Sequence, residues 1–139
     1  MTPRLADILR GCAVALSAPL PDEAGPEYAA GRQSIVGLLL TLAAQEAEHG
    51  AAAAHFENAA IAALIAEWGP RLGLQVEAAG ADGDLTLTGL EAANARLRRS
   101  LTALHEAAEA AGERALERRI LELYRDMAKA RRLEVSLGG

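Results

Sequence analysis

The chain has 139 residues, of which 51% are hydrophobic and 24% are charged, with one cysteine and a formal net charge of -5. This composition excludes a disordered chain, a disulfide framework and a cysteine-based zinc site, and the acidic balance argues against a nucleic-acid partner. Alanine and leucine supply 33 and 22 residues, which is typical of closely packed helices. We therefore expect one all-α domain over 1–139, an antiparallel bundle of four to five helices.

The first predicted helix starts at Thr2 or Pro3, because threonine is a good N-cap and proline is tolerated in the first helical turn. Prolines and a glycine predict a loop over 19–26. No leader-like segment precedes the helix, and no apolar run reaches the ~20 residues that span a bilayer. The single Cys12 is suited to a reducing compartment, so we expect a cytoplasmic protein. Arginine is favoured over lysine, which together with the many alanines suggests a bacterial source. We expect no membrane partner.

The next helix begins near Glu27 and carries an apolar stripe, followed by a second helical run over 51–68 that Gly69-Pro70 ends. An unbroken helix over 27–68 would be ~60 Å long at 1.5 Å per residue. That length is too great for a domain this small unless the chain dimerises, so we expect a break or bend near Gly50. The stripe, predicted to be buried, consists of Ile35, Leu38, Leu39 and Leu42.

Residues 70–87 alternate apolar and polar side chains around an Asp82-Gly83 turn, which predicts a short β-hairpin. The alternative is an irregular connection whose leucines close the end of the bundle. Thr88 and Glu91 then have the spacing of a capping box at the start of a helix.

This helix carries leucines with helical spacing and ends in a tight turn at residues 110–112. The last helix runs from Glu113 to about Arg132, with its apolar side chains facing inward. The tail over 133–139 is expected to be flexible. The apolar residues that we expect to be buried in these two helices are Leu90, Leu97, Leu101, Leu104, Ala108, Leu116, Ile120, Leu123, Tyr124 and Met127.

Polar residues on predicted apolar stripes are the candidate functional residues, because a buried polar group without a partner costs ~1–3 kcal/mol. Each must pair with another, face water at a helix end, or hold a ligand. They are Glu46, His49, Asn58, Asn94 and His105.

Glu46 and His49 form a Glu-x-x-His pair, which places a carboxylate and an imidazole on one helix face. The pair resembles one quarter of the carboxylate-bridged di-metal site of ferritin-like bundles, which use two such motifs. That resemblance implies a divalent metal, and His105 with Glu109 could complete a mononuclear site. The alternative needs no metal: His49 lies at a helix C-terminus, and His105 is a core histidine.

Asn58 and Asn94 lie on two helices that could run side by side. A buried asparagine can fix the register of helices, and two such amides could pair directly. Contact with a ligand is the alternative for both residues.

The arginines of the last two helices alternate with glutamates, which is typical of a solvated helix face with ion pairs. No phosphate loop, nucleophile motif or catalytic triad is found in the sequence, so we assign no catalytic residue and expect no enzyme. The sequence favours a non-catalytic interaction or scaffold protein, as a homodimer or with a protein partner. Candidate interfaces are the face of 51–68 and the C-terminal helix. The alternative is the metal- or ligand-binding bundle.

Overall fold

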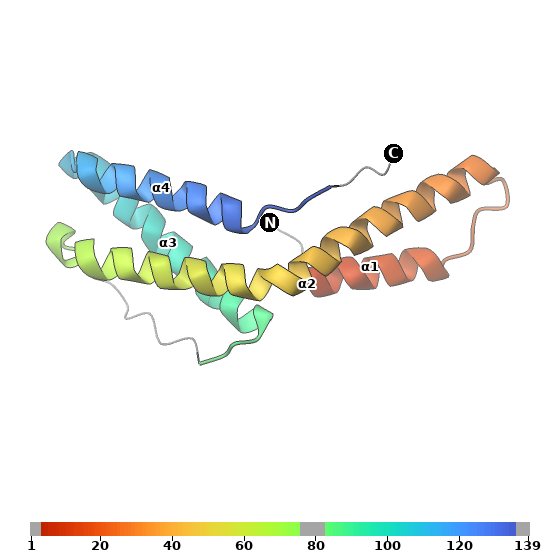
Figure 1. Cartoon of the computed structure of the whole chain (residues 1–139), viewed down its shortest axis with the longest axis horizontal. Helices are drawn as coiled ribbons and strands as arrows, with labels where there is room; N and C mark the ends of the chain where they lie inside the picture. The colour runs from red at the N-terminus through yellow and green to blue at the C-terminus, as the bar shows by residue number, and fades with distance from the viewer. Residues whose placement is uncertain (1–3, 76–82, 136–139) are drawn as a thin grey trace. The chain divides into compact units, whose positions relative to one another are not determined.

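The computed structural model describes residues 4–75 and 83–135, and in these ranges every regular element is helical. The predicted all-α class is confirmed, and none of the described helices is apolar over enough residues to cross a bilayer. The elements are α1 (Leu5–Ser17), α2 (Pro26–Trp68), the single-turn 3-10 helix η1 (Pro70–Leu72), α3 (Leu87–Ala111) and α4 (Arg114–Ala130), labelled in Figure 1.

The chain divides into two compact units, which are described separately below. Unit 1 comprises Met1–His49 and Leu133–Gly139, and unit 2 comprises Gly50–Arg132. Whether the two units together form the predicted single domain over 1–139 is not tested by this division.

Unit 1 is a helical hairpin in which α1 lies antiparallel to the first part of α2 (Figure 1). The Arg32 guanidinium donates two hydrogen bonds of 3.2 Å to the carbonyl oxygen of Ala18, just beyond the end of α1. The buried apolar residues of this unit are Cys12, Val36 and Ala43. Two of them are small, so the interior of unit 1 is thin.

The first helix begins at Leu5, with Arg4 at its N-cap, and the predicted starting residues Thr2 and Pro3 lie outside the described part of the chain.

Elsewhere in unit 1, Gln45 and Glu134 are joined by two hydrogen bonds, in which each residue donates to the other. The Gln45 amide donates to the Glu134 carbonyl, and the Glu134 amide donates to the Gln45 side chain, each over 2.8 Å. The predicted flexible tail is therefore held at Glu134, and its last part, 136–139, lies outside the described residues.

The predicted break of the second helix at Gly50 is wrong, because α2 is helical from Pro26 to Trp68; the alternative, a bend near Gly50, stays a prediction. A glycine in a helix interior costs only ~1 kcal/mol relative to alanine and removes no backbone hydrogen bond. Gly50 is buried and is followed by four alanines, which favour a helix strongly. The boundary between the two units nevertheless falls between His49 and Gly50.

Unit 2 packs the second part of α2 together with α3 and α4, the latter two running antiparallel (Figure 1). Its core joins residues from all three helices, and the inward faces predicted for α3 and α4 are confirmed. The buried members are Ile61, Leu64, Ile65, Leu101, Leu104, Ala108, Leu116, Ile120 and Met127, with Trp68, Leu72, Leu74, Leu97, Leu123 and Tyr124 packed against them.

The predicted hairpin over 70–87 is not found among its described residues. Residues 70–72 form η1, Leu87 already belongs to α3, and the predicted turn partly falls on 76–82, outside the described part. Leu72 and Leu74 pack against the core of unit 2. The alternative prediction, an irregular connection with leucines on the bundle core, describes these two residues correctly.

Helix α3 starts two residues earlier than the predicted capping box. Thr86 is the N-cap, and its hydroxyl accepts a hydrogen bond of 3.1 Å from the amide of Gly89. Asp84 accepts from both the amide and the hydroxyl of Thr86, over 2.9 and 2.6 Å. These hydrogen bonds lower the pKa of Asp84. The prediction of Thr88 as the cap is thus wrong, because Asp84 orients an earlier threonine.

The turn between α3 and α4 depends on Gly112, whose φ of +68° lies in the left-handed region. Its amide donates to the carbonyls of Ala108 and Glu109, and the amide of Glu113 also donates to Ala108. This is the arrangement that glycine commonly provides after the last turn of a helix. It reverses the chain where the sequence predicts a tight turn, so that α4 returns along α3.

Candidate functional site

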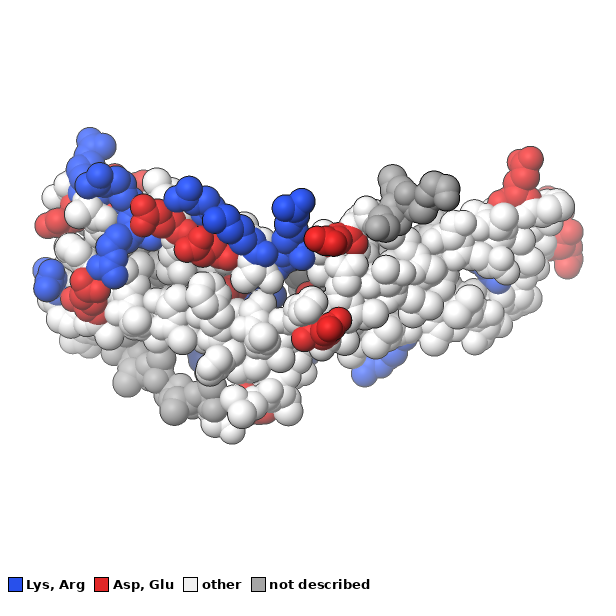
Figure 2. Space-filling model, viewed as in Figure 1, with Lys and Arg blue, Asp and Glu red and all other residues white. Residues whose placement is uncertain are grey.

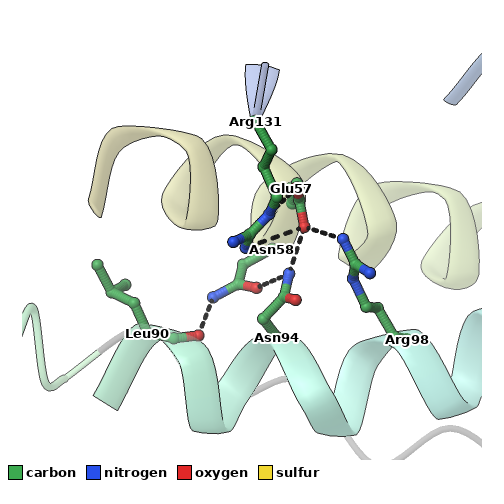
Figure 3. Close-up of polar contacts among 6 residues, drawn as sticks. All are labelled: Glu57, Asn58, Leu90, Asn94, Arg98 and Arg131. Atoms are coloured by element: carbon green, nitrogen blue, oxygen red, sulfur yellow. Dashed lines mark hydrogen bonds and ion pairs between the residues drawn. The ribbon is translucent and has the colours of Figure 1, made fainter. Parts of the chain in front are cut away.

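Unit 2 contains a network of buried polar side chains that are joined by hydrogen bonds (Figure 3). Its centre is Glu57 of α2, whose side chain is fully buried. Asn58 and Asn94 are buried beside it, at 3% and 6% exposure. Arg98 of α3 and Arg131, just after α4, approach the same carboxylate.

Both oxygens of the Glu57 carboxylate accept hydrogen bonds. Oε2 accepts from the Asn94 amide and from Arg98, each over 2.8 Å, and Oε1 accepts from Nε of Arg131 over 2.6 Å. A second Arg131 nitrogen lies 3.4 Å from Oε2. One carboxylate therefore connects α2, α3 and the end of α4 (Figure 3).

The two predicted asparagines pair directly, as the sequence suggests they could. The Asn94 amide nitrogen donates to Oδ1 of Asn58 over 3.0 Å, and the Asn58 amide donates to the backbone carbonyl of Leu90 over 3.1 Å. This pairing requires one register of α2 against α3, because a shift of either helix by one residue would separate the amides. It is the contact expected of asparagines that specify register.

Two opposing effects set the pKa of Glu57. Burial alone would raise it, but the hydrogen bonds from Arg131, Arg98 and Asn94 outweigh burial, and the pKa is lowered from its ordinary value. The carboxylate is therefore ionised at neutral pH. With both oxygens already accepting strong hydrogen bonds, Glu57 is suited to hold helices together rather than to accept a proton from a substrate.

The sequence contains a signal for Glu57 that our sequence-based reasoning missed. Glu57 lies four residues before Ile61 and seven before Leu64, so it shares the buried face of α2 with them. The sequence likewise predicts a solvated face for Arg98. It is about half exposed, at 46%, but its guanidinium reaches the buried carboxylate. A long side chain can extend from a helix surface to a buried partner in this way.

The four predicted metal ligands lie in two different units. Glu46 and His49 belong to unit 1, where His49 is exposed and its Nε2 lies 3.8 Å from the adjacent Glu48. His105 and Glu109 share one face of α3 in unit 2, with 3.7 Å between Nε2 and Oε1. The described residues contain no group of three His, Cys, Asp or Glu side chains that could hold a metal ion. The shared metal site stays a prediction, and no geometry on the described residues favours it.

His105 is about three-quarters buried and contacts an aromatic ring. Its ring centre lies 5.8 Å from that of Tyr124, at an interplanar angle of 56°. Burial raises the pKa of Tyr124. These contacts agree with the alternative interpretation of His105 as a core histidine.

Replacing Asn94 with leucine is expected to lower the free energy of unfolding by about 1–3 kcal/mol, because Oδ1 of Asn58 would remain buried without this donor. The double variant Asn58→Leu/Asn94→Leu removes both amides. It should therefore be less destabilised than the sum of the single variants, with a coupling of about 0.5–3 kcal/mol. Chemical denaturation of the four proteins of this cycle measures the coupling. Strict additivity would contradict a direct amide pair.

No protein-family model, curated protein or solved structure significantly matches this chain. The fold and the site define an all-α protein whose three-helix unit is locked by one buried carboxylate.

Proposed function

We propose that the chain is a non-catalytic interaction protein that binds a protein partner through the apolar surface of unit 1. The proposal rests on the distribution of exposed large apolar side chains. Of fourteen such residues in the described part of the chain, nine fall between Leu9 and Leu40. They are Leu9, Val14, Leu16, Leu20, Tyr28, Ile35, Leu38, Leu39 and Leu40.

Such a concentration is unusual for a surface that only meets water. Isolated exposed apolar residues are normal, whereas groups of them mark sites of interaction. In the view of Figure 2, the surface over α1 and the first part of α2 shows few charged side chains, while α4 and its surroundings carry many of both signs. The thin interior of unit 1 supports the same proposal, because a partner would supply apolar contacts that three buried residues cannot.

Unit 2 is suited to act as a rigid scaffold for the interaction surface of unit 1. Its core and its buried ion pairs are complete within the chain. The Glu57 carboxylate is occupied by its donors and offers no site for a substrate. A stable helical unit joined to a thin, apolar one fits a protein that holds and presents an interaction surface.

Site-specific photo-crosslinking tests this proposal. A photo-reactive phenylalanine derivative would replace Leu38 in one version of the full chain and Ala44 in another. Both positions are exposed on α2, but they lie about 120° apart around the helix. In cells of the protein's source, we expect a protein adduct of defined mass from position 38 and not from position 44. Equal labelling from both positions, or no adduct from either, would overturn the proposal.

A further inference from the structure

The first part of α2 carries a largely exposed apolar stripe beside the side of the helix that packs in the interior of unit 1. Its members, spaced by three and four residues, are Ile35, Leu38, Leu39 and Leu42, here called the α2 stripe. Ile35 is 63% exposed, and Leu38 and Leu39 are each more than a third exposed. The sequence predicts that this stripe is buried; in the single chain Ile35, Leu38 and Leu39 are exposed and Leu42 is half-buried.

The buried side of the same helix is marked by Val36 and Ala43, which are seven residues apart. At 100° per residue, this side is rotated by about 100° from the centre of the α2 stripe. Packing within unit 1 therefore uses one side of α2 and leaves the stripe to another occupant.

Resting on the function proposed above, we infer that the occupant is a second copy of this chain, with the two α2 stripes packed antiparallel about a two-fold axis. In such a pairing, Ile35 of one copy lies opposite Leu42 of the other, and Leu38 lies opposite Leu39 near the axis. A two-fold interface uses the same patch on both copies, so the patch must be complementary to itself. A continuous apolar stripe meets that requirement.

The charges at the two ends of the stripe are complementary between two antiparallel copies of the chain. From Gln33 to Gln45 the helix carries no charged residue, and the stretch is flanked by Arg32 and Glu46. Antiparallel pairing about Leu38 and Leu39 brings Arg32 of each copy near Glu46 of the other. The Arg32 guanidinium donates two hydrogen bonds to Ala18 of its own chain and has further N–H groups for that carboxylate. A parallel pairing would instead place arginine against arginine and glutamate against glutamate.

The uncharged stretch also matters because each chain carries a net charge of -5. Two copies repel each other at long range, and they can approach most closely where neither surface carries like charges. A strongly charged partner would find no complementary groups on the stripe.

The size of the surface sets the expected affinity. The segment from Arg32 to Glu46 is four helical turns long, about 22 Å. Stable interfaces bury about 800 Å² on each partner, and smaller ones are generally transient. A stripe of this length falls at the lower end of that range. We therefore expect a dimer that dissociates on dilution through the micromolar range.

Sedimentation velocity of the full chain over a range of concentrations tests the inference. The expected result is a rise from the mass of one chain, 14.5 kDa, to twice that mass. The variant Leu38→Glu/Leu39→Glu should remain monomeric at every concentration. Ala44→Glu, on the opposite side of α2, adds a charge without touching the stripe and should dimerise like the unmodified chain. Circular dichroism checks that both variants keep their helices.

The charged residues at the ends of the stripe test the orientation. Glu46→Arg should weaken the dimer at least tenfold, because Arg32 of each copy would then face an arginine at position 46 of the other. The swapped variant Arg32→Glu/Glu46→Arg should dimerise more strongly than the single variant. In a mixture of Ile35→Cys chains and Leu42→Cys chains, mild oxidation should give mainly the mixed disulfide.

Three results would overturn the inference: a constant monomer mass, equal loss of the dimer in Ala44→Glu, or preferential disulfides between identical positions. If the chain stays monomeric but position 38 still forms an adduct with a different protein, only the inference that the occupant is a second copy would be overturned. The proposed interaction function would then stand. Absence of both the dimer and the adduct would overturn both proposals.

Discussion

A chain in which Arg98 and Arg131 are both replaced by methionine is expected to lose about 3–5 kcal/mol of its free energy of unfolding at neutral pH. Glu57 would stay fully buried, while the two guanidinium groups that hold its charge would be gone. Methionine keeps much of the apolar stem of each arginine, so the loss reports mainly on charge and hydrogen bonding. Denaturation followed by the fluorescence of Trp68, the only tryptophan, measures the change.

The same variant should reverse the pH dependence that Glu57 contributes. In the unmodified chain the folded-state pKa of Glu57 lies below its ordinary value of about 4.5. Its stabilising contribution is therefore present above that value and is lost as the pH falls through the folded-state pKa. Without the arginines, burial dominates and raises the pKa. Stability is then greatest below the ordinary value and falls as the pH rises through the raised one.

Adding Glu57→Gln to the double methionine variant provides the control. This triple variant has no carboxylate at position 57, so the contribution of this group to the pH dependence should disappear, and part of the lost stability should return. If the double and triple variants showed the same stability from pH 4 to pH 8, Glu57 would not be the buried charge that the arginines compensate.

Leu104→Ala is expected to lower the free energy of unfolding of unit 2 by about 2–5 kcal/mol. Leu104 is fully buried in the core that α2, α3 and α4 share, so truncation removes apolar contacts with residues of several helices. The result is measured by denaturation with Trp68 as the probe, since this residue packs against the same core. A loss below about 1 kcal/mol would mean that the core collapses around the missing methyl groups.

The matched control for this truncation is Leu121→Ala on α4. It removes the same atoms from a side chain that is 57% exposed. Since substitutions at exposed positions away from special features usually change stability by no more than about 0.5 kcal/mol, we expect a small effect. The contrast between the two leucines separates core packing from any general effect of alanine on a helix.

Most of unit 2 could be predicted from the sequence because local signals and burial agree there. Gly69-Pro70 ends α2, and glycine reverses the chain at residue 112. Leucines at helical spacing identify the faces of α3 and α4 that point inward. The asparagines stand out because the surrounding residues are so uniformly apolar. Their direct pairing was one of the alternatives that the sequence left open.

The remaining features depend on contacts between segments that are distant in sequence. Helical spacing places Glu57 on the buried face of α2, but no local pattern reveals that arginines 41 and 74 residues later reach its carboxylate. Thr86 is selected as a helix cap by Asp84, although Thr88 has the better local spacing. For the α2 stripe, the sequence indicates correctly that four positions are apolar. Periodicity alone cannot show whether the same chain covers them.

The bond between Arg131 and Glu57 has a consequence for shortening the protein. The last buried core residue of α4 is Met127, and the helix itself ends at Ala130. Judged by packing alone, a chain ending at Ala130 would be complete. Such a chain would nevertheless lack the guanidinium that lies closest to the buried carboxylate, at 2.6 Å. The smallest intact version of unit 2 therefore ends after Arg131, one residue beyond its last helix.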